Sequence, residues 1–398
     1  MSVSKIAAGA AQVLSTRELN RALLARQFLL GRPALGRADV TGMVEHLIGL
    51  QAQAPFPPYY GLLSRLDGFR PGDLARLIED RSVVRLALMR GTIHLVSARD
   101  SLPLRQLVQP VIERMFRTNH GKRLPGVDLA ELAARGAELV DAEPLTFAEL
   151  GAALAARWPD RPAADLAQGV RALVPLVQVP PRAVWGKAGL ARHTSAQAWL
   201  GSGEPEQMSL STLVRRYLGA FGPASVKDVQ TWSGLTGLRA VVQDMRGDLV
   251  TFRDHNGVEL FDLPDAPRPA GQTPAPVRLV AEFDNLVLSH ADRSRVISPE
   301  HWRFVASPNG IFPGIVLIDG FAAGLWRLDG GTLTIDLWAA ASRATIREIT
   351  AEAERLLAFA VPEATPDIRI TSLPPASPRR AELPEVERRV WSGCREGH

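Results

Sequence analysis

Apolar residues recur at helical spacing through the first eighty residues of the chain. The first such run is preceded by Ser15 and Glu18, a capping-box pair that predicts a helix from about residue 15 to about residue 30. Its apolar positions fall on one face of that helix and are Leu19, Leu23, Leu24 and Phe28. The same pattern predicts helices over 38–50 and 71–81.

The period changes to two beyond residue 82. Residues 83–88 and 92–96 alternate as short strands do, and Met89-Arg90-Gly91 joins them as a tight hairpin. Helices followed by a two-stranded hairpin are the outline of a winged helix-turn-helix module. A similar order recurs twice. The second module has predicted helices at 128–141, 146–157 and 163–174 and wing strands at 176–179 and 183–186. The third begins with predicted helices at 211–221 and 225–234.

The last third of the chain is mostly strand-like. A proline-rich connector over 264–276 precedes it, and Asp329-Gly330-Gly331 is a strong hairpin signal. The predicted strands are 277–280, 286–288, 314–318, 321–327 and 332–338. An amphipathic pattern over 341–360 predicts a closing helix.

These patterns predict an α+β protein of tandem winged helix-turn-helix modules with a β-rich C-terminal part. A length of 398 residues is too great for one ordinary core, so several modules are expected. The predicted parts are a disordered tail over 1–15, winged-helix modules over 16–100, 101–204 and 205–265, a β-rich region with its closing helix over 266–376, and a flexible basic tail over 377–398.

Composition narrows the class of protein. An apolar fraction of 46% supports several cores, while no apolar run is long enough for a membrane span and the opening lacks a secretory signal, so we expect a cytoplasmic protein. Cys394 is the single cysteine, which excludes an intrachain disulfide and a multi-cysteine zinc site. His290, Asp292 and His301 follow no ligand spacing. We therefore predict neither a metal nor a cofactor.

The charge balance fits a polyanionic partner without requiring one. The net charge is +4 and the sequence pI is about 9.6. Only four of the 46 basic residues are lysines, and the arginine excess suits bidentate phosphate contacts. A GC-rich codon bias explains the same excess equally well.

Two glutamines separated by one small residue stand out in the first module. Gln51 and Gln53 follow an apolar helical run, and three prolines come after them. Proline disfavours helical backbone for the residue before it, so the helix that begins near Thr41 is expected to end at about Leu50 or Gln51. Positions i and i+2 diverge by roughly 200° on a helix but project to the same side of extended backbone. The two carboxamides can then address one ligand, unless they only cap the helix end.

This motif resembles the signature of the AlkZ-like winged-helix DNA glycosylases, which is Gln, a small or apolar residue, then Gln. Further segments that are similar to that family, in the same order along most of the chain, are 19–27, 89–96, 231–235, 282–293 and 310–314. The resemblance implies a monofunctional DNA glycosylase with Gln51 and Gln53 as its catalytic residues. It also implies removal of bulky N7-guanine adducts, including interstrand crosslinks, made by genotoxic natural products.

The chemistry of glutamine restricts which bases such an enzyme can release. The side chain is neutral and does not titrate near neutral pH, so it cannot act as a general base as a carboxylate does. It can orient a water molecule, and its carbonyl dipole can stabilise an oxocarbenium-like transition state. That suffices only for a good leaving group. Guanine alkylated at N7 is one, because its positive charge is neutralised as the bond breaks.

Several side chains are candidates for contacts with DNA. Arg90 and Thr92 lie near the hairpin tip, and His94 follows in the strand, where a buried core histidine is the alternative. The other candidates are Lys122, Arg123, Arg182, Arg293 and Arg327. Lys122 and Arg123 belong to a predicted surface loop. The alternative is that these charged side chains face only solvent. The polar segment 284–293 suits a joint between modules as well as a DNA contact.

The predicted function is hydrolysis of the N-glycosidic bond of N7-alkylguanine in double-stranded DNA. We expect a monomer that neither binds a membrane nor requires a protein partner. The rival is a non-catalytic winged-helix regulator, but three modules favour a monomeric clamp and no heptad pattern for a dimer is present. A lyase-active glycosylase would need a nucleophilic amine, and no lysine lies between Lys5 and Lys122.

Overall fold

The computed structural model describes residues 12–36, 39–201, 203, 206–306, 310–363 and 365–372. A five-stranded antiparallel sheet lies at the centre of this part of the chain. Its strands, in spatial order, are β1 (Leu50–Gln51), β3 (Ile93–Ser97), β2 (Val83–Ala87), β4 (Leu176–Gln178) and β5 (His193–Ser195). Since the first three come from the first predicted module and the last two from the second, one hydrogen-bonded sheet crosses the boundary predicted at residue 100.

The predicted β2–β3 hairpin is present and packs with the helices of the first module. These elements are α1 (Thr16–Arg26), α2 (Val40–His46), α3 (Pro57–Leu63), α4 (Pro71–Glu79) and the 3-10 turn η1 (Met89–Gly91). The Ser15–Glu18 capping box begins α1 as predicted. Helix α3 was not predicted, because the prolines after Gln53 were taken as a stop signal for the preceding helix. Pro57 and Pro58 occupy its first turn, where the missing N–H has no intrahelical acceptor to lose.

Helix α2 ends earlier than predicted, at His46 instead of Leu50 or Gln51. The chain reverses through Ile48 and Gly49, whose φ angles are 54° and 89°. A side chain at Gly49 would place its Cβ 2.5 Å from Val96 Cγ1 and 3.0 Å from the Leu95 carbonyl oxygen, so only glycine fits this turn. The turn delivers Gln51 into strand β1, whose extended backbone is as expected, whereas Gln53 lies in the bend that follows.

The second predicted module is mostly helical. Its elements are α5 (Ala98–Asn119), the 3-10 turn η2 (Gly121–Arg123), α6 (Leu129–Ala142), α7 (Phe147–Ala155), α8 (Ala163–Leu173) and α9 (Ala196–Leu200). The long helix α5 was missed because Pro103 and Pro110 lie inside it. The wing strand predicted at 183–186 is wrong, because these residues form turns. Strand β5 pairs with β4 instead, with His193 opposite Gln178.

The third predicted module has the expected order of helices followed by a hairpin. Its elements are α10 (Leu210–Phe221), α11 (Val226–Ser233), α12 (Leu238–Asp244), the 3-10 turn η3 (Arg246–Asp248), β6 (Val250–Arg253) and β7 (Glu259–Asp262). Residues 12–15 were predicted to be disordered, but Val13 forms a parallel bridge with Arg253. Leu14 is buried in a small cluster with Leu19 and Phe252, so this end of the predicted tail is an ordered part of the fold.

A second five-stranded sheet forms the C-terminal part. Its elements, with three helices, are β8 (Arg278–Val280), α13 (Asn285–Leu288), α14 (Pro299–Val305), β9 (Gly314–Ile318), β10 (Phe321–Asp329), β11 (Thr332–Leu337), α15 (Arg343–Ala360) and β12 (Asp367–Ser372). The predicted hairpin and closing helix are β10–β11 and α15. The strand predicted at 286–288 is wrong, since these residues form helix α13. The basic tail predicted over 377–398 lies outside the described residues.

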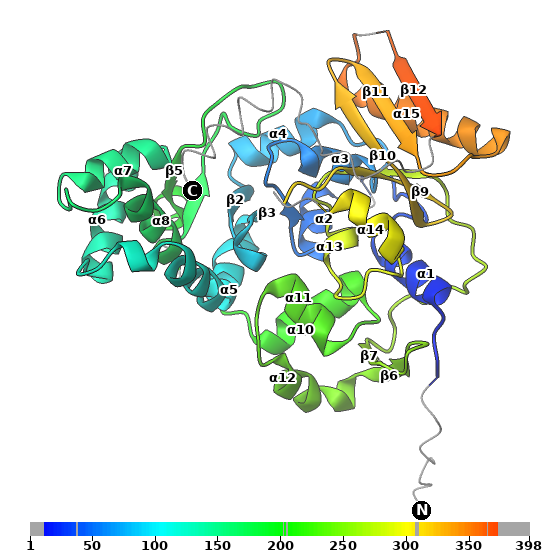
Figure 1. Ribbon diagram of the computed structural model, residues 1–398, viewed down its shortest axis with the longest axis horizontal. Helices are drawn as coiled ribbons and strands as arrows, with labels where there is room; N and C mark the ends of the chain where they lie inside the picture. The colour runs from blue at the N-terminus through cyan, green and yellow to red at the C-terminus, as the bar shows by residue number, and fades with distance from the viewer. Residues whose placement is uncertain are drawn as a thin grey trace, which may run out of the picture.

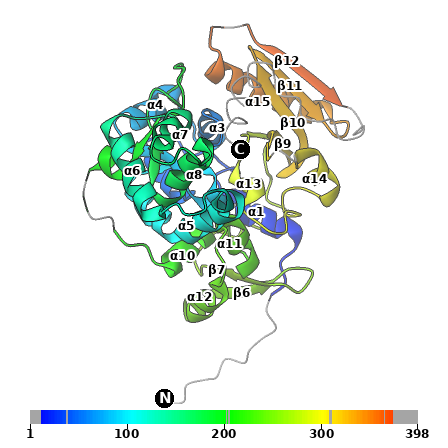
Figure 2. The ribbon, with the colours of Figure 1, turned by 60° about the vertical axis from the view of Figure 1, so that its left-hand side comes forward.

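The parts are arranged around the β2–β3 hairpin. Figure 1 shows α6, α7 and α8 at one end of the molecule and the C-terminal sheet with α15 at the other, while α10–α12 lie beneath the hairpin. The view in Figure 2 shows the same separation from a second side. The mixture of helices and strands confirms the predicted α+β class.

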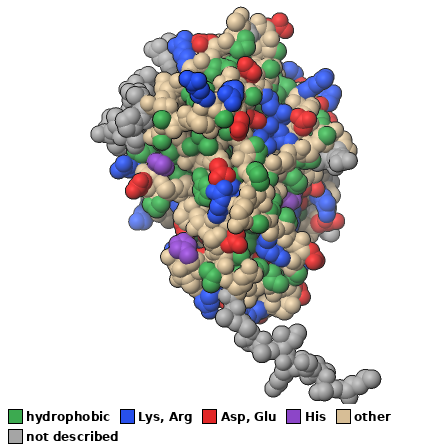
Figure 3. All heavy atoms as spheres, turned by 90° about the vertical axis from the view of Figure 1, so that its right-hand side faces the viewer, with side chains coloured by type: hydrophobic (Ala, Val, Ile, Leu, Met, Phe, Trp, Pro, Cys, Tyr) green, Lys and Arg blue, Asp and Glu red, His purple; other side chains and the backbone are tan. Residues whose placement is uncertain are grey.

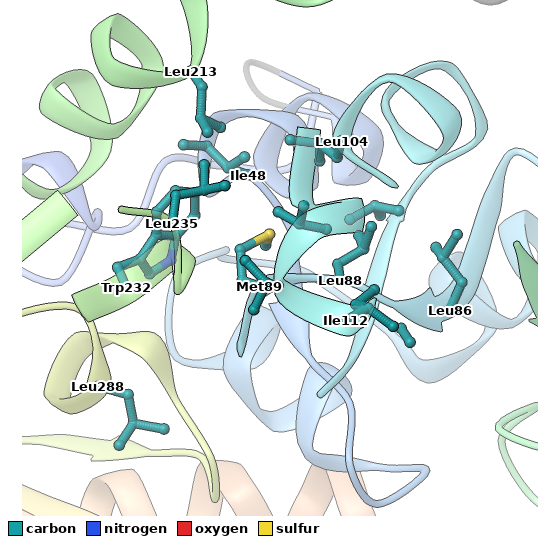
Figure 4. Close-up of a cluster of buried hydrophobic side chains, with 14 of the residues drawn as sticks. Ile48, Leu86, Leu88, Met89, Leu104, Ile112, Leu213, Trp232, Leu235 and Leu288 are labelled. Atoms are coloured by element: carbon teal, nitrogen blue, oxygen red, sulfur yellow. The ribbon is translucent and has the colours of Figure 1, made fainter. Parts of the chain in front are cut away.

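One hydrophobic cluster joins all of these parts. Met89 and Leu86 of the first module meet Leu104 of α5, Trp232 of α11 and Leu288 of α13 in a common core (Figure 4). Figure 4 draws Met89 between the Trp232 side and the Leu104 side of this cluster. The module boundaries remain predictions, but the first sheet crosses the one at residue 100 and the shared core includes residues from every predicted module.

A buried ion pair fixes the C-terminal part against α3. Arg65 donates two hydrogen bonds to Asp284, at 2.8 and 2.9 Å, and the side chains of these two residues are only 1% and 3% exposed. Arg65 also donates to Gln27 Oε1 at 2.9 Å, and the Leu286 N–H donates a hydrogen bond to Asp284 Oδ1 at 2.8 Å. Asp284, at the start of the segment 284–293, therefore serves as a joint between the first module and the C-terminal part.

Removing one side of this pair should be costly. We expect Asp284→Ala to lower the free energy of unfolding by about 3–5 kcal/mol, because it leaves the Arg65 guanidinium buried without its carboxylate. Urea denaturation followed by circular dichroism measures the change. Asp248→Ala is the matched control, since Asp248 pairs with Arg215 on the surface and should contribute at most about 1 kcal/mol. Similar losses in the two variants would contradict the assigned role of the buried pair.

Candidate active site

Gln51 lies at the end of edge strand β1. Its neighbour across the sheet is His94 of β3, and the Gln51 residue is 6% exposed. Its side-chain oxygen Oε1 accepts a hydrogen bond from Arg90 Nη2 at 2.8 Å. The carboxamide is therefore held from the tip of the β2–β3 hairpin.

Gln53 ends the pairing between β1 and β3 with its side chain. The Ala52 N–H donates a hydrogen bond to the Ile93 carbonyl at 2.8 Å, as in an antiparallel ladder. The return bond would run from the Ile93 N–H to the Ala52 carbonyl, but Ile93 donates to Gln53 Oε1 instead, at 3.2 Å. Gln53 is exposed, whereas Ala52 is fully buried. The two glutamines thus share one neighbouring strand but differ in exposure to solvent.

Arg90 points into the protein. It has a left-handed backbone, with φ of 57°, at the hairpin tip. Its guanidinium donates to Gln51 Oε1, to Asn285 Oδ1 at 3.0 Å, and to the carbonyl of Trp232. Burial lowers the pKa of Arg90 to about 10, which leaves it protonated at neutral pH. The predicted contact of its guanidinium with DNA phosphate does not fit this inward placement.

His94 is a buried neutral residue. Its side chain is fully buried, and Nδ1 lies 3.1 Å from the Thr92 carbonyl oxygen. Burial, reinforced by the nearby charge of Arg90, lowers the pKa of His94 to about 3. The alternative of a core histidine therefore describes it, and as placed it cannot reach DNA directly. Thr92 is half-buried, and its hydroxyl donates a hydrogen bond to the Met89 carbonyl inside the turn.

The other candidates for DNA contacts lie on elements separate from the glutamines. Arg123 pairs with Asp165 at 2.5 Å beside the exposed Lys122, and Arg182 donates to the Gly189 carbonyl at 3.1 Å. Arg327 is exposed on β10 and pairs with Asp336 at 2.8 Å. Arg293 donates to the Val287 carbonyl at 3.1 Å and lies 4.3 Å above the ring of Trp302. Among the candidates, Arg90 hydrogen-bonds Gln51, and Thr92 and His94 flank Ile93, the neighbour of Gln53.

Two residues of the site were not predicted. Arg85 is buried on β2 and donates to the Ala52 carbonyl at 2.7 Å and, more weakly, to the Ala54 carbonyl at 3.4 Å. Burial lowers the pKa of Arg85 to about 9. Its signal in the sequence is a charged residue within the apolar strand 83–88. Asn285, which accepts a hydrogen bond from Arg90, lies in the segment 284–293, which was predicted to form either a joint between modules or a contact with DNA.

Two hollows in the described chain lie away from the glutamines. One hollow of about 440 Å³ is lined by His46, Asp100 and Arg216, and another of about 240 Å³ by Asp228 and Asp254. Neither includes Gln51 or Gln53. Among the described residues no group of three or more His, Cys, Asp and Glu side chains is placed to hold a metal ion. None of the described helices is long and apolar enough to cross a membrane.

Comparison with known proteins identifies the family. The model of the family "DNA glycosylase AlkZ-like" matches residues 44–359. The chain is 27% identical over 350 residues to an interstrand DNA cross-link repair glycosylase of Streptomyces sahachiroi, which covers 82% of this chain and 92% of that protein. It is similar in fold to the structure of the Streptomyces sahachiroi DNA glycosylase AlkZ, with a TM-score of 0.74, 22% identity, and coverage of 90% of this chain and all of that one.

The fold and the match across most of the chain define a DNA glycosylase. The chain belongs to the AlkZ-like DNA glycosylase family. Both the family and the enzyme class predicted from the sequence are confirmed.

Buried neutral histidines should make the stability of the protein depend on pH. Burial lowers the pKa of His94 and of His193 to about 3, whereas in the unfolded chain each returns to about 6.5. Between these values the unfolded chain binds more protons than the folded one. Stability is therefore lost as pH falls from 6.5 toward 3, by about 1.4 kcal/mol per pH unit for each histidine.

Urea denaturation at pH 7.5 and pH 5.0 tests this dependence. A His94→Gln variant should lose less stability between the two pH values than the wild type, because one of the buried neutral histidines is gone. An identical pH dependence in the variant and the wild type would show that His94 does not contribute.

Proposed function

We propose that this glycosylase hydrolyses the N-glycosidic bond of N7-alkylguanine in double-stranded DNA, with Gln51 and Gln53 as its catalytic residues. The observation that carries the proposal is that the oxygens of both carboxamides accept hydrogen bonds from the β2–β3 hairpin, and that no carboxylate hydrogen-bonds either of them among the described residues. A pair of neutral amides can orient water and stabilise positive charge on the sugar. It cannot supply the acid help that an uncharged base requires, so a cationic base is the substrate.

We further propose that bulky and crosslinked N7 adducts are included. A base tethered to the opposite strand cannot be extruded into a closed pocket, so the enzyme must bring its catalytic groups to the duplex. Gln53 is exposed on a short proline-bounded segment, which suits such an approach. The name of the Streptomyces sahachiroi relative, an interstrand DNA cross-link repair glycosylase, supports this substrate class. Removal of lesions made by genotoxic natural products, as self-resistance, is the corresponding proposed role.

The proposed contacts with the DNA backbone come from separate arginine and lysine residues. They are Lys122, Arg123, Arg182, Arg293 and Arg327. On the face drawn in Figure 3, basic and acidic side chains are interspersed. Phosphate contacts on that face would therefore come from individual side chains, and the β10–β11 hairpin that carries Arg327 is the element we propose to approach a groove. We propose that the protein acts as a monomer.

The first test is the release of a modified base. The protein is incubated with duplex DNA that contains one N7-methylguanine, and the free base and the resulting abasic site are quantified. The same duplex with guanine at that position is the control. DNA binding without base release would favour the non-catalytic regulator.

Gln51→Ala and Gln53→Ala should each slow excision by at least about tenfold, the order of loss for one transition-state contact. Their affinity for DNA should hardly change, since neither removes a phosphate contact. Single-turnover rates and fluorescence-polarisation titrations measure the two quantities. Gln243→Ala, at an exposed position on α12, is the matched control. Full excision by both variants would refute the site assignment, and parallel losses of rate and affinity would make the glutamines structural.

An open site should also tolerate large groups at guanine N7. We expect the single-turnover rate to differ by less than about tenfold between a methyl and a polycyclic adduct at one position, which corresponds to under roughly 1.4 kcal/mol in barrier. Efficient release of the methylated base without release of the bulky one would reveal a confining pocket.

A further inference from the structure

Arg90 connects one catalytic glutamine to two distant parts of the chain. Its guanidinium reaches Gln51 on β1, Asn285 at the start of α13, and the Trp232 carbonyl in α11. These partners come from the first module, the C-terminal part and the third module. Because all three are acceptors, the guanidinium is held in one position by groups whose own places are set by the packing of the whole molecule.

The chemistry of the donors determines how both carboxamides are oriented. An arginine side chain has only N–H donors, so the atom of Gln51 that faces Arg90 must be Oε1. A backbone N–H also only donates, so the Ile93 N–H requires Oε1 of Gln53. In each glutamine the oxygen is therefore held against the hairpin. The amide nitrogen and one remaining lone pair of the oxygen are left for substrate and water.

The position of Arg90 is itself supported from behind. Asn285 follows Asp284, whose carboxylate is bound by Arg65 through two hydrogen bonds in the core. The Asn285 side chain is thus presented by backbone that a buried ion pair fixes. A free carboxamide can rotate by half a turn and exchange its oxygen and nitrogen, which would spoil the geometry in which it meets a water molecule.

We propose that Arg90 is a positioning residue, which fixes the carboxamide orientation of Gln51 for base excision and does not contact DNA. The inference rests on the proposed function, because it assigns Arg90 a role in that reaction. Arg90→Met should slow single-turnover excision of N7-methylguanine by about tenfold, comparable with Gln51→Ala. The affinity for the same duplex should be unchanged, since the guanidinium faces the protein interior.

A double-mutant cycle distinguishes positioning from an independent contribution. If Arg90 acts through Gln51, the double variant Arg90→Met/Gln51→Ala should be no slower than Gln51→Ala, because no oriented amide remains to be lost. Rate losses that multiply in the double variant would overturn the proposal. A fall in DNA affinity that matches the fall in rate in Arg90→Met would overturn it as well.

Arg171→Met is the matched control. Arg171 is also a half-buried arginine at the hairpin tip, but it donates to the Gly91 carbonyl, at 2.9 Å, and not to a glutamine. It should keep the wild-type excision rate. If it slows excision as much as Arg90→Met does, support of the hairpin matters rather than orientation of the amide, and the proposal fails. Should Arg90→Met not fold, Asn285→Leu removes one acceptor of Arg90 and is expected to slow excision, while a wild-type rate would overturn the proposal.

Crystal structures of the wild type and Arg90→Met give a readout that does not depend on activity. Gln51 should adopt one side-chain conformation in the wild type and a different or second one in the variant. An unchanged Gln51 conformation in the variant would overturn the proposal even if its rate fell. If the wild type released no base, the proposed function would fail, and this comparison would still decide whether Arg90 orients Gln51.

Discussion

Buried guanidinium groups require acceptors, and this requirement determines how distant segments of the chain pack together. Arg26 of α1 donates two hydrogen bonds to Asp262 of β7, and Arg65 donates two to Asp284, with both pairs buried. The partners are 236 and 219 positions apart in sequence. Because a buried arginine without its partner costs several kcal/mol, each pair holds a late segment against the first module. A sheet common to the first two predicted modules and a hydrophobic core shared by all of them complete the same association.

The same requirement shapes the active site. Arg85 binds the backbone around Ala52, and Arg90 binds the side chain of Gln51, so the motif is held by one arginine at its backbone and by another at its amide. The acceptors for these two arginines are carbonyl and carboxamide oxygens, and burial keeps the neighbouring His94 neutral. The site therefore carries positive charge close to the glutamines without a carboxylate hydrogen-bonded to either arginine in the described chain. Such a charge is favourable beside the DNA backbone.

Membership of the AlkZ-like family and the geometry of the glutamines are independent observations that lead to one chemistry. In the proposed function, neutral amides contribute orientation and dipoles rather than proton transfer, so the charge of the damaged base would drive bond breaking. The site also lies where β1, the hairpin, α11 and α13 meet.

The sequence by itself determined the features that depend on local pattern and residue type. The capping box of α1, the β2–β3 and β10–β11 hairpins, the α+β class, the family and the extended backbone at Gln51 all follow from neighbouring residues. Prolines misled the prediction of α3 and α5, because the same residue ends a helix before it, begins one after it, or is tolerated inside a long one. Only the tertiary structure decided that β4 and β5 join the first sheet, that Asp284 belongs to a joint, and that Arg90 turns inward to Gln51. Asp284 lies 219 positions from Arg65, and the Trp232 and Asn285 acceptors of Arg90 lie 142 and 195 positions from it, so no local pattern encodes these contacts.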